Sequence, residues 1–241
     1  MVHRLNDQAW QFLQSNINGS HDQETIVSSQ PTICEEDGEP DRNDLAAQEL
    51  TGRTPESLSN GTLSVNFGGG DVLTEISGAR DPDNPNTDPL AGAPDPCRSS
   101  TEPPLPLGVD YYRGQSQPLP DERTYVGLGE VEIPYTLTGA VAEVNARVWD
   151  IAPNGGPTLL MTRGTYRLEL GKDPSSGTLR LPLFGNQYQL KPGHRLRLDL
   201  QEVDSLTFRH NNTTNTFDFS NPTLKLPTRQ SGDKTLTGVG N

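Results

Sequence analysis

The clearest structural signal in the sequence lies in Arg147-Val-Trp-Asp-Ile-Ala-Pro-Asn-Gly-Gly-Pro-Thr-Leu-Leu-Met-Thr-Arg-Gly-Thr-Tyr-Arg167 and in Pro192-Gly-His-Arg-Leu-Arg-Leu-Asp-Leu200. Strand-like runs alternate with turn-forming residues in these segments, and in Leu196–Leu200 apolar and polar residues alternate as in a strand with one buried face. Turn-forming residues separate the alternating runs, at Pro153-Asn-Gly-Gly-Pro157 and at Pro192-Gly193. These segments therefore predict β-strands joined by tight turns.

The same alternation extends over most of the second half of the chain. About eight short strands, with turns about every 8–12 residues, are indicated between Thr124 and Leu226. This spacing predicts an all-β fold, a jelly-roll β-sandwich with long loops, and the stretches 25–33 and 61–67 predict two earlier strands. The apolar positions of the alternating runs are Val131, Ile133, Tyr135 and Leu137; Ala142, Val144, Ala146 and Val148; Leu179, Leu181 and Leu183; Leu196, Leu198 and Leu200; Phe217, Phe219, Leu224 and Leu226.

The N-terminal residues follow a different period. Leu5, Ala9, Phe12, Leu13 and Ile17 share one face at helical spacing, and Asn18-Gly19 ends the pattern. A single amphipathic helix of this length is marginal in water, so it must dock on a neighbour. We expect a terminal helix within residues 1–18 and a β-sandwich domain over 19–229. Within that domain we expect a loop-rich insertion at about 81–120, and after it a flexible tail over 230–241.

Charge is distributed unevenly along the chain. Residues 1–120 hold 6 Lys and Arg against 19 Asp and Glu, whereas residues 121–241 hold 13 of each, so the net charge of −13 belongs to the first half. An acidic surface disfavours nucleic-acid binding. No apolar run is long enough for a membrane span. The N-terminal residues lack the apolar core of a signal peptide, which leaves the location of the protein unknown.

The sequence offers few candidates for catalytic or metal-binding residues. Cys34 and Cys97 lack metal-ligand spacing, and either a disulfide or two free thiols fits their positions. No two of the four histidines have metal-ligand spacing, and no Gly-x-Ser-x-Gly nucleophile elbow is present. We therefore predict no catalytic, metal or cofactor residue. Trp149, Asp150 and His194 remain as candidate ligand or interdomain contacts, with structural roles favoured for all three. For Asp150 the expected role is to accept backbone N–H groups in the turn that follows it.

Four arginines are expected to have structural roles as well. They are candidates to pair with Asp150, Asp199 or Asp204 across strands: Arg163, Arg167, Arg195 and Arg197.

Four motifs carry a resemblance to a known family. Arg147-Val-Trp-Asp-Ile-Ala-Pro-Asn-Gly155, Thr162-Arg-Gly-Thr-Tyr-Arg167, Pro192-Gly-His-Arg-Leu-Arg-Leu-Asp-Leu200 and Phe208-Arg-His-Asn-Asn212 resemble, in this order, the C-terminal domain of X-prolyl dipeptidyl-peptidases and cocaine-esterase-like acyl hydrolases. The resemblance covers roughly residues 124–228, and residues 20–120 match more loosely. In that family a galactose-binding-like jelly roll follows an α/β-hydrolase domain with a Ser-His-Asp triad.

The resemblance implies a role without chemistry of its own. Residues 5–13 are similar to the last helix of the family's hydrolase domain, so the chain is expected to start just after the triad. It would then be an accessory β-sandwich that shapes substrate access and subunit contacts in a dipeptidyl-peptidase or related ester hydrolase. Its expected partner is an α/β-hydrolase catalytic domain, in the same protein or as a separate chain. Homo-oligomer formation, and peptide versus ester specificity, stay open.

An alternative hypothesis places the protein in a different functional class. The jelly roll is shared with carbohydrate-binding modules, so the chain could be a free-standing carbohydrate-binding or interaction module. Trp149 would then be the sugar-stacking platform.

Overall fold

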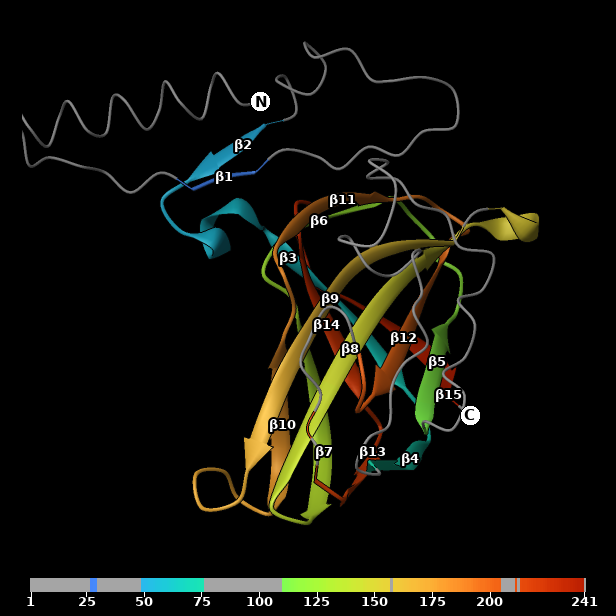
Figure 1. The fold of residues 1–241 in the computed structure, drawn as a ribbon. Coiled ribbons are helices and arrows are strands. Elements are labelled where there is room, and N and C mark those ends of the chain that lie inside the picture. The colour runs from blue at the N-terminus through green and yellow to red at the C-terminus, as the bar shows by residue number, and fades with distance from the viewer. Residues whose placement is uncertain are drawn as a thin grey trace, which may run out of the picture.

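The computed structural model describes residues 27–29, 49–75, 110–156, 158–204, 211 and 213–240. These residues are almost entirely β-structure (Figure 1). The strands are β1 Val27–Ser29, β2 Leu50–Gly52, β3 Gly61–Phe67, β4 Gly70–Glu75, β5 Tyr111–Ser116, β6 Arg123–Gly127, β7 Glu130–Thr138, β8 Val141–Ile151, β9 Thr158–Glu169, β10 Ser176–Pro182, β11 Asn186–Leu190, β12 Arg195–Gln201, β13 Asn215–Ser220, β14 Thr223–Thr228 and β15 Lys234–Gly240. Two short 3₁₀ turns, η1 Pro55–Leu58 and η2 Pro153–Gly155, complete the described elements.

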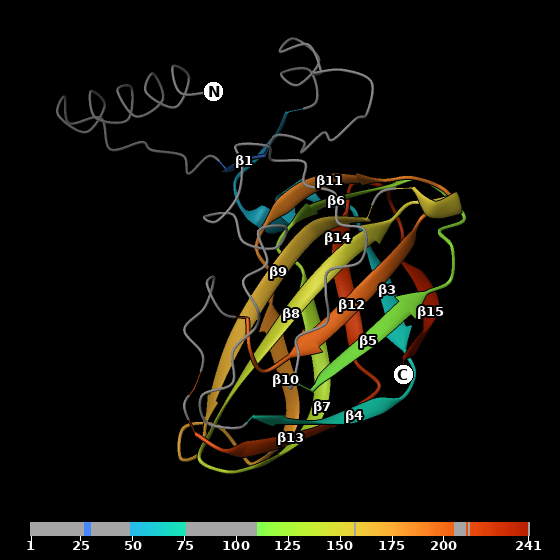
Figure 2. The same ribbon diagram turned by 45° about the vertical axis from the view of Figure 1, so that its right-hand side comes forward.

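The strands form two facing layers, which confirms the predicted all-β sandwich. One path of hydrogen-bonded neighbours runs β4-β13-β7-β14-β3-β15-β5-β12-β8-β9, and β10 joins it beside β7. Strands β5, β12, β8 and β9 lie side by side in one layer (Figure 2), which we call the front sheet. Strands β10, β7, β14, β13 and β4 belong to the opposite layer. Because β15 pairs with both β3 and β5, it joins the two layers.

The core lies between the layers and is built by the alternation seen in the sequence. Every apolar position named above from the alternating runs is buried, and all of them belong to one cluster. Aromatic residues join the two layers, since the rings of Tyr112 in β5 and Phe219 in β13 meet edge to face at 5.3 Å. Burial raises the pKa of Tyr112 to about 12, as expected for a phenol in apolar surroundings.

The C-terminal residues correct one prediction. Residues 230–241 were expected to be a flexible tail, but Lys234–Gly240 forms β15, parallel to β3 and antiparallel to β5. The sequence shows no apolar alternation over this strand, because only Leu236 among its side chains is buried. Gly238 faces Phe67, where an added Cβ would come within 2.5 Å of the ring. The strand therefore contributes backbone and a glycine at a close approach, with little apolar signal in the sequence.

The predicted loop-rich insertion at 81–120 is also partly wrong. Tyr111–Ser116 forms β5, a strand inside the front sheet. Its inward positions are Tyr112, Gly114 and Ser116, so apolar alternation is nearly absent. Gly114 is required there because an added Cβ would lie 2.7 Å from Phe67. Residues 81–109, the predicted helix within 1–18, Cys34 and Cys97 lie outside the described residues.

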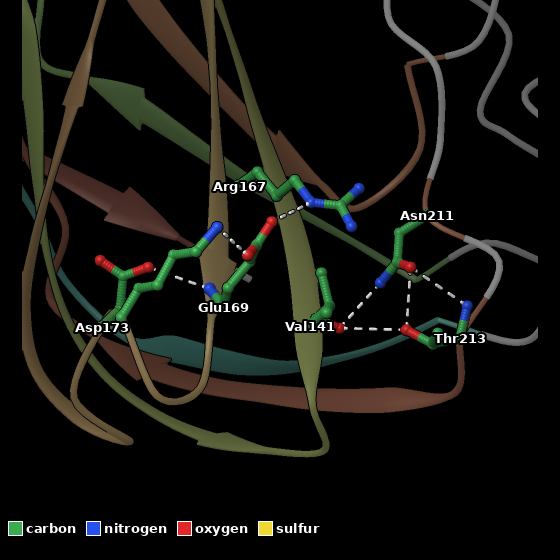
Figure 3. Close-up of polar contacts among 7 residues, drawn as sticks. Val141, Arg167, Glu169, Asp173, Asn211 and Thr213 are labelled. Atoms are coloured by element: carbon green, nitrogen blue, oxygen red, sulfur yellow. Dashed lines mark hydrogen bonds and ion pairs between the residues drawn. The ribbon is translucent and has the colours of Figure 1, made fainter.

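Side-chain hydrogen bonds secure the lower end of the front sheet (Figure 3). Asn211 donates from Nδ2 to the carbonyl oxygen of Val141 at 2.7 Å, and the Thr213 hydroxyl reaches the same oxygen at 3.3 Å. The backbone N–H of Glu169 donates to Asp173 at 2.9 Å, which fixes the turn after β9. These contacts attach both flanking turns to the ends of β8 and β9.

Candidate functional site

Two of the three candidate residues from the sequence are in direct contact. The Nδ1 atom of His194 lies 2.9 Å from Oδ1 and 3.1 Å from Oδ2 of Asp150. The phenol of Tyr188 donates a 2.9 Å hydrogen bond to Asp150 Oδ2. Asp150 is at the end of β8, Tyr188 is in β11, and His194 is in the turn before β12. We call these three residues the Asp150 cluster.

Local turn chemistry brings His194 to this position. Gly193 adopts a positive φ of 83°, which glycine tolerates without steric cost. Its N–H donates to the carbonyl of Leu119 at 2.8 Å, and the Leu119 N–H donates to the carbonyl of His194 at 2.8 Å. The backbone on both sides of the turn is thereby fixed, and the imidazole is held against the end of β8.

The Asp150 carboxyl is nearly inaccessible to solvent. Its residue is 3% exposed, and this burial raises the pKa of Asp150 above its ordinary value, although contacts with His194 and Tyr188 act in the opposite direction. Burial beside this carboxyl also raises the pKa of Tyr188, so the phenol stays protonated and remains a donor. The His194 side chain is 17% exposed. The cluster is therefore a buried carboxyl that accepts from Tyr188 and contacts His194, whose side chain reaches the surface.

Asp150 does not have the role that the sequence suggested. It was expected to accept backbone N–H groups in the turn that follows, and instead its carboxyl accepts from the Tyr188 hydroxyl and contacts Nδ1 of His194. The turn itself is closed by the Gly156 N–H donating to the carbonyl of Pro153 at 3.1 Å. Tyr188 was missed because Tyr188 and Leu190 are the two apolar residues of Asn186–Leu190, too few to make a recognisable pattern, so β11 was not predicted.

A second polar group lies on the outer face of the front sheet, away from the core. The carboxylate of Asp204 accepts from the guanidinium of Arg147, with Nε at 3.3 Å, and lies 3.7 Å from Nη1 of Arg163. The carboxylate of Asp199 contacts Arg113 at 3.0 Å and Arg197 at 3.3 Å. We call these six residues the outer charged layer. Each carboxylate in it lies between two arginines.

Trp149 belongs to this outer face. It is fully buried but outside the core cluster, and the guanidinium carbon of Arg197 lies 5.1 Å from its ring centroid. This distance is typical of a cation–π contact. A sugar-stacking platform needs an exposed ring face, and Trp149 does not present one in this structure.

The sequence predicted partners for four arginines, with mixed success. Arg163 and Arg197 were expected to pair with Asp150, Asp199 or Asp204, and they contact Asp204 and Asp199 respectively. Arg167 instead pairs with Glu169 two residues along its own strand (Figure 3), and Arg195 donates to the carbonyl of Ser116. Strand register places Arg163 beside Arg147, so both arginines reach Asp204 after β12. Arg197 and Asp199 lie two residues apart on β12 itself, so their contact is not a cross-strand pair.

The chemistry available in the described part of the chain is limited. A hydrolytic triad needs a nucleophilic hydroxyl beside a histidine that an acid orients. His194 and Asp150 could supply the last two groups, but within the described ranges no serine hydroxyl contacts His194. Across the same ranges, no three His, Cys, Asp or Glu side chains gather as a metal site would require, and no helix is long and apolar enough to cross a bilayer.

Comparison with known proteins gives structural neighbours only. No protein-family model and no curated sequence matches the chain. Solved structures similar to it include an α-amino acid ester hydrolase, with TM-score 0.48 and 14% identity, covering 67% of this chain and 33% of that one. They also include an aminopeptidase from a marine sediment Thaumarchaeota archaeon, with TM-score 0.47, 12% identity and coverage of 87% and 38%. A CocE/NonD family hydrolase from Staphylococcus aureus has TM-score 0.35, 9% identity and coverage of 49% and 33%.

These neighbours are hydrolases by name. They are of the kind that the four sequence motifs resemble, at low identity and over part of their length. The chain spans about a third of the length of these three hydrolase structures.

Proposed function

We propose that this chain is the C-terminal accessory β-sandwich of a serine hydrolase that resembles X-prolyl dipeptidyl-peptidases. The parent enzyme would cleave a peptide or ester bond by acyl transfer through a serine to water. The serine, and the histidine and acid that activate it, would belong to an α/β-hydrolase domain elsewhere in the protein or in a partner chain. The sandwich would lie beside that domain, shape access to its active site and contribute subunit contacts.

The contact between Asp150 and His194 is the observation that carries this proposal. Asp150 belongs to the first family-like motif and His194 to the third, 44 residues later. Their side chains bind each other, so the most chemically suggestive residues of both motifs act in holding the end of the sandwich together. Motif residues that serve the architecture favour a structural domain, and they leave the chemistry to another part of the enzyme.

The Asp150 cluster is also poorly arranged for nucleophilic catalysis. The hydroxyl that contacts Asp150 belongs to Tyr188, whose raised pKa keeps it protonated. In a triad the hydroxyl would instead contact the second ring nitrogen of the histidine. The exposed part of His194, at this end of the sandwich, would be free to face the catalytic domain, as the sequence-based interdomain hypothesis supposes.

Reconstitution tests the proposal. The polypeptide encoded directly upstream is expressed alone and together with this chain, and X-Pro-nitroanilide and aryl-ester turnover is measured. We expect an upstream Ser-Asp-His hydrolase whose activity or stability depends on the sandwich. His194→Ala serves as an interface variant, with Arg180→Ala on an exposed site of β10 as its control. The proposal would be overturned if no such hydrolase were encoded upstream and none copurified with this chain as a partner.

A further inference from the structure

We propose that Asn154 is a site of spontaneous deamidation in the folded protein, and that Asn60, which has the same following residue, is protected. This inference is independent of the proposed function. Two Asn-Gly pairs lie in the described ranges, Asn154-Gly155 and Asn60-Gly61. Glycine after asparagine favours the reaction because no side chain hinders attack by its backbone nitrogen. The two sites share this sequence, so structure alone distinguishes them.

The reaction exchanges one bond for another at the asparagine side chain. The backbone nitrogen of Gly155 loses its proton and bonds to Cγ of Asn154, the Cγ–Nδ2 bond breaks, and ammonia leaves. Water then opens the resulting cyclic imide at either carbonyl carbon, which gives aspartate or isoaspartate. No reagent other than water is needed. The geometry must allow the glycine nitrogen to approach the side chain, which requires rotation of the asparagine backbone.

The turn after β8 permits this rotation. Asn154, Gly155 and Gly156 are exposed, and an atom placed at the Cβ position of Gly155 would have nothing within 4 Å. Asn154 holds a left-handed conformation with φ of 59°, which is a strained backbone region for a residue with a side chain. No hydrogen bond to the Asn154 side chain is present among the described parts of the chain. Short exposed turns of this kind open at low free-energy cost.

Hydrogen bonds and close packing restrain Asn60 and the glycine that follows it. Its Nδ2 donates to the carbonyl of Arg229 at 2.9 Å, and its backbone N–H donates to the carbonyl of Thr228 at 2.8 Å. Gly61 begins β3, paired with Thr228, and an added Cβ there would lie 2.4 Å from the carbonyl oxygen of Gly232. The side chain is therefore tethered and the backbone cannot turn without breaking the sheet.

The reaction adds a carboxylate to the turn between β8 and β9. Asn154 follows Asp150 by four residues, and a Cβ added at Gly193, the neighbour of His194, would lie 4.0 Å from the Pro153 ring. Isoaspartate also lengthens the backbone at Asn154, in a turn whose φ values are already positive at two successive residues. The modification therefore alters the connection that supports one side of the Asp150 cluster.

Peptide mapping by mass spectrometry tests the proposal on the purified full chain, aged at mildly alkaline pH with and without urea. In urea both sites should convert at similar rates. In the folded protein, Asn154 should convert faster than Asn60 by about tenfold or more, because only the turn opens locally. Isoaspartate should appear in the peptide containing Asn154, detected with an isoaspartate methyltransferase and labelled methyl donor. Asn154→Gly, which adopts the positive φ of this position without steric cost, should abolish that signal without lowering Tm.

Two results would overturn the proposal. One is conversion of Asn60 as fast as Asn154 in the folded chain. The other is an unmodified Asn154 under folded conditions that persists while both sites convert in urea. Asn18-Gly19, outside the described residues, is mapped as a separate peptide and affects neither comparison.

Discussion

Replacing Asp204 by asparagine should destabilise the sandwich severely, because the change leaves two buried guanidinium groups without their shared carboxylate. The Asp204 side chain is 1% exposed, and those of Arg147 and Arg163 are 5% and 7% exposed. Breaking a buried ion pair by removing one partner costs about 3–5 kcal/mol, since the remaining charge keeps its desolvation penalty. Both arginines make further contacts, so we expect the lower end of this range, about 3 kcal/mol.

Urea unfolding monitored by tryptophan fluorescence measures this loss, because Trp149 is buried on the same face. Asp121→Asn is the matched control. Asp121 also pairs with an arginine, Arg123 at 3.1 Å, but its side chain is 47% exposed. Exposed pairs contribute about 0–1 kcal/mol. If Asp204→Asn and Asp121→Asn reduced the free energy of unfolding equally, within about 1 kcal/mol of wild type, the reasoning about the outer charged layer would be refuted.

Three further predictions follow from the packing and electrostatics. Gly164→Ala should lower the free energy of unfolding by about 1–3 kcal/mol or more, because its Cβ would lie 2.0 Å from the carbonyl oxygen of Pro182. Gly68→Ala is the control: its Cβ would have its nearest atom at 3.7 Å, so stability should change by less than about 0.5 kcal/mol. Equal melting temperatures of the two variants would contradict this. Leu236→Ala should cost about 2 kcal/mol because it opens the core at β15, and the exposed Val239→Ala, in the same strand, should be nearly silent in the same urea assay. Asp150 has a raised folded-state pKa, so its protonated form is favoured in the fold and its contribution to stability declines as pH rises above the ordinary value of 3.8. Asp150→Asn should therefore gain stability relative to wild type as pH rises from about 4 to about 6, and a relative loss over that window would show that the sign is wrong.

The sequence predicted the strands that carry regular alternation. β3 was predicted with its observed bounds, and β8 and β12 follow the apolar positions of the motifs. Strands with glycine at inward positions were missed, because a glycine that admits Phe67 leaves no apolar signal. This explains β5, with Gly114, and β15, with Gly238. Alternation reports side-chain burial, and a strand that contributes backbone to a close contact does not show it.

The sequence identified two residues of the candidate site but did not predict that they contact each other. Asp150 and His194 were both singled out, yet their contact depends on the turn at Gly193 and on the pairing of β8 with β12. Tyr188 could not be predicted because its strand lacked a pattern. Asp204 was named as one option for several arginines, and only the register of β8, β9 and β12 selects Arg147 and Arg163 as its partners.

The central proposal is that this chain is an accessory domain without a catalytic nucleophile of its own. Treatment of the purified chain with a serine-directed phosphonate, followed by intact-mass measurement and by assay with aryl-ester and X-Pro-nitroanilide substrates, tests it most directly. We expect no phosphonate adduct and no turnover above the buffer rate. Turnover that disappears in step with the attachment of one phosphonate to a serine of this chain would contradict the claim.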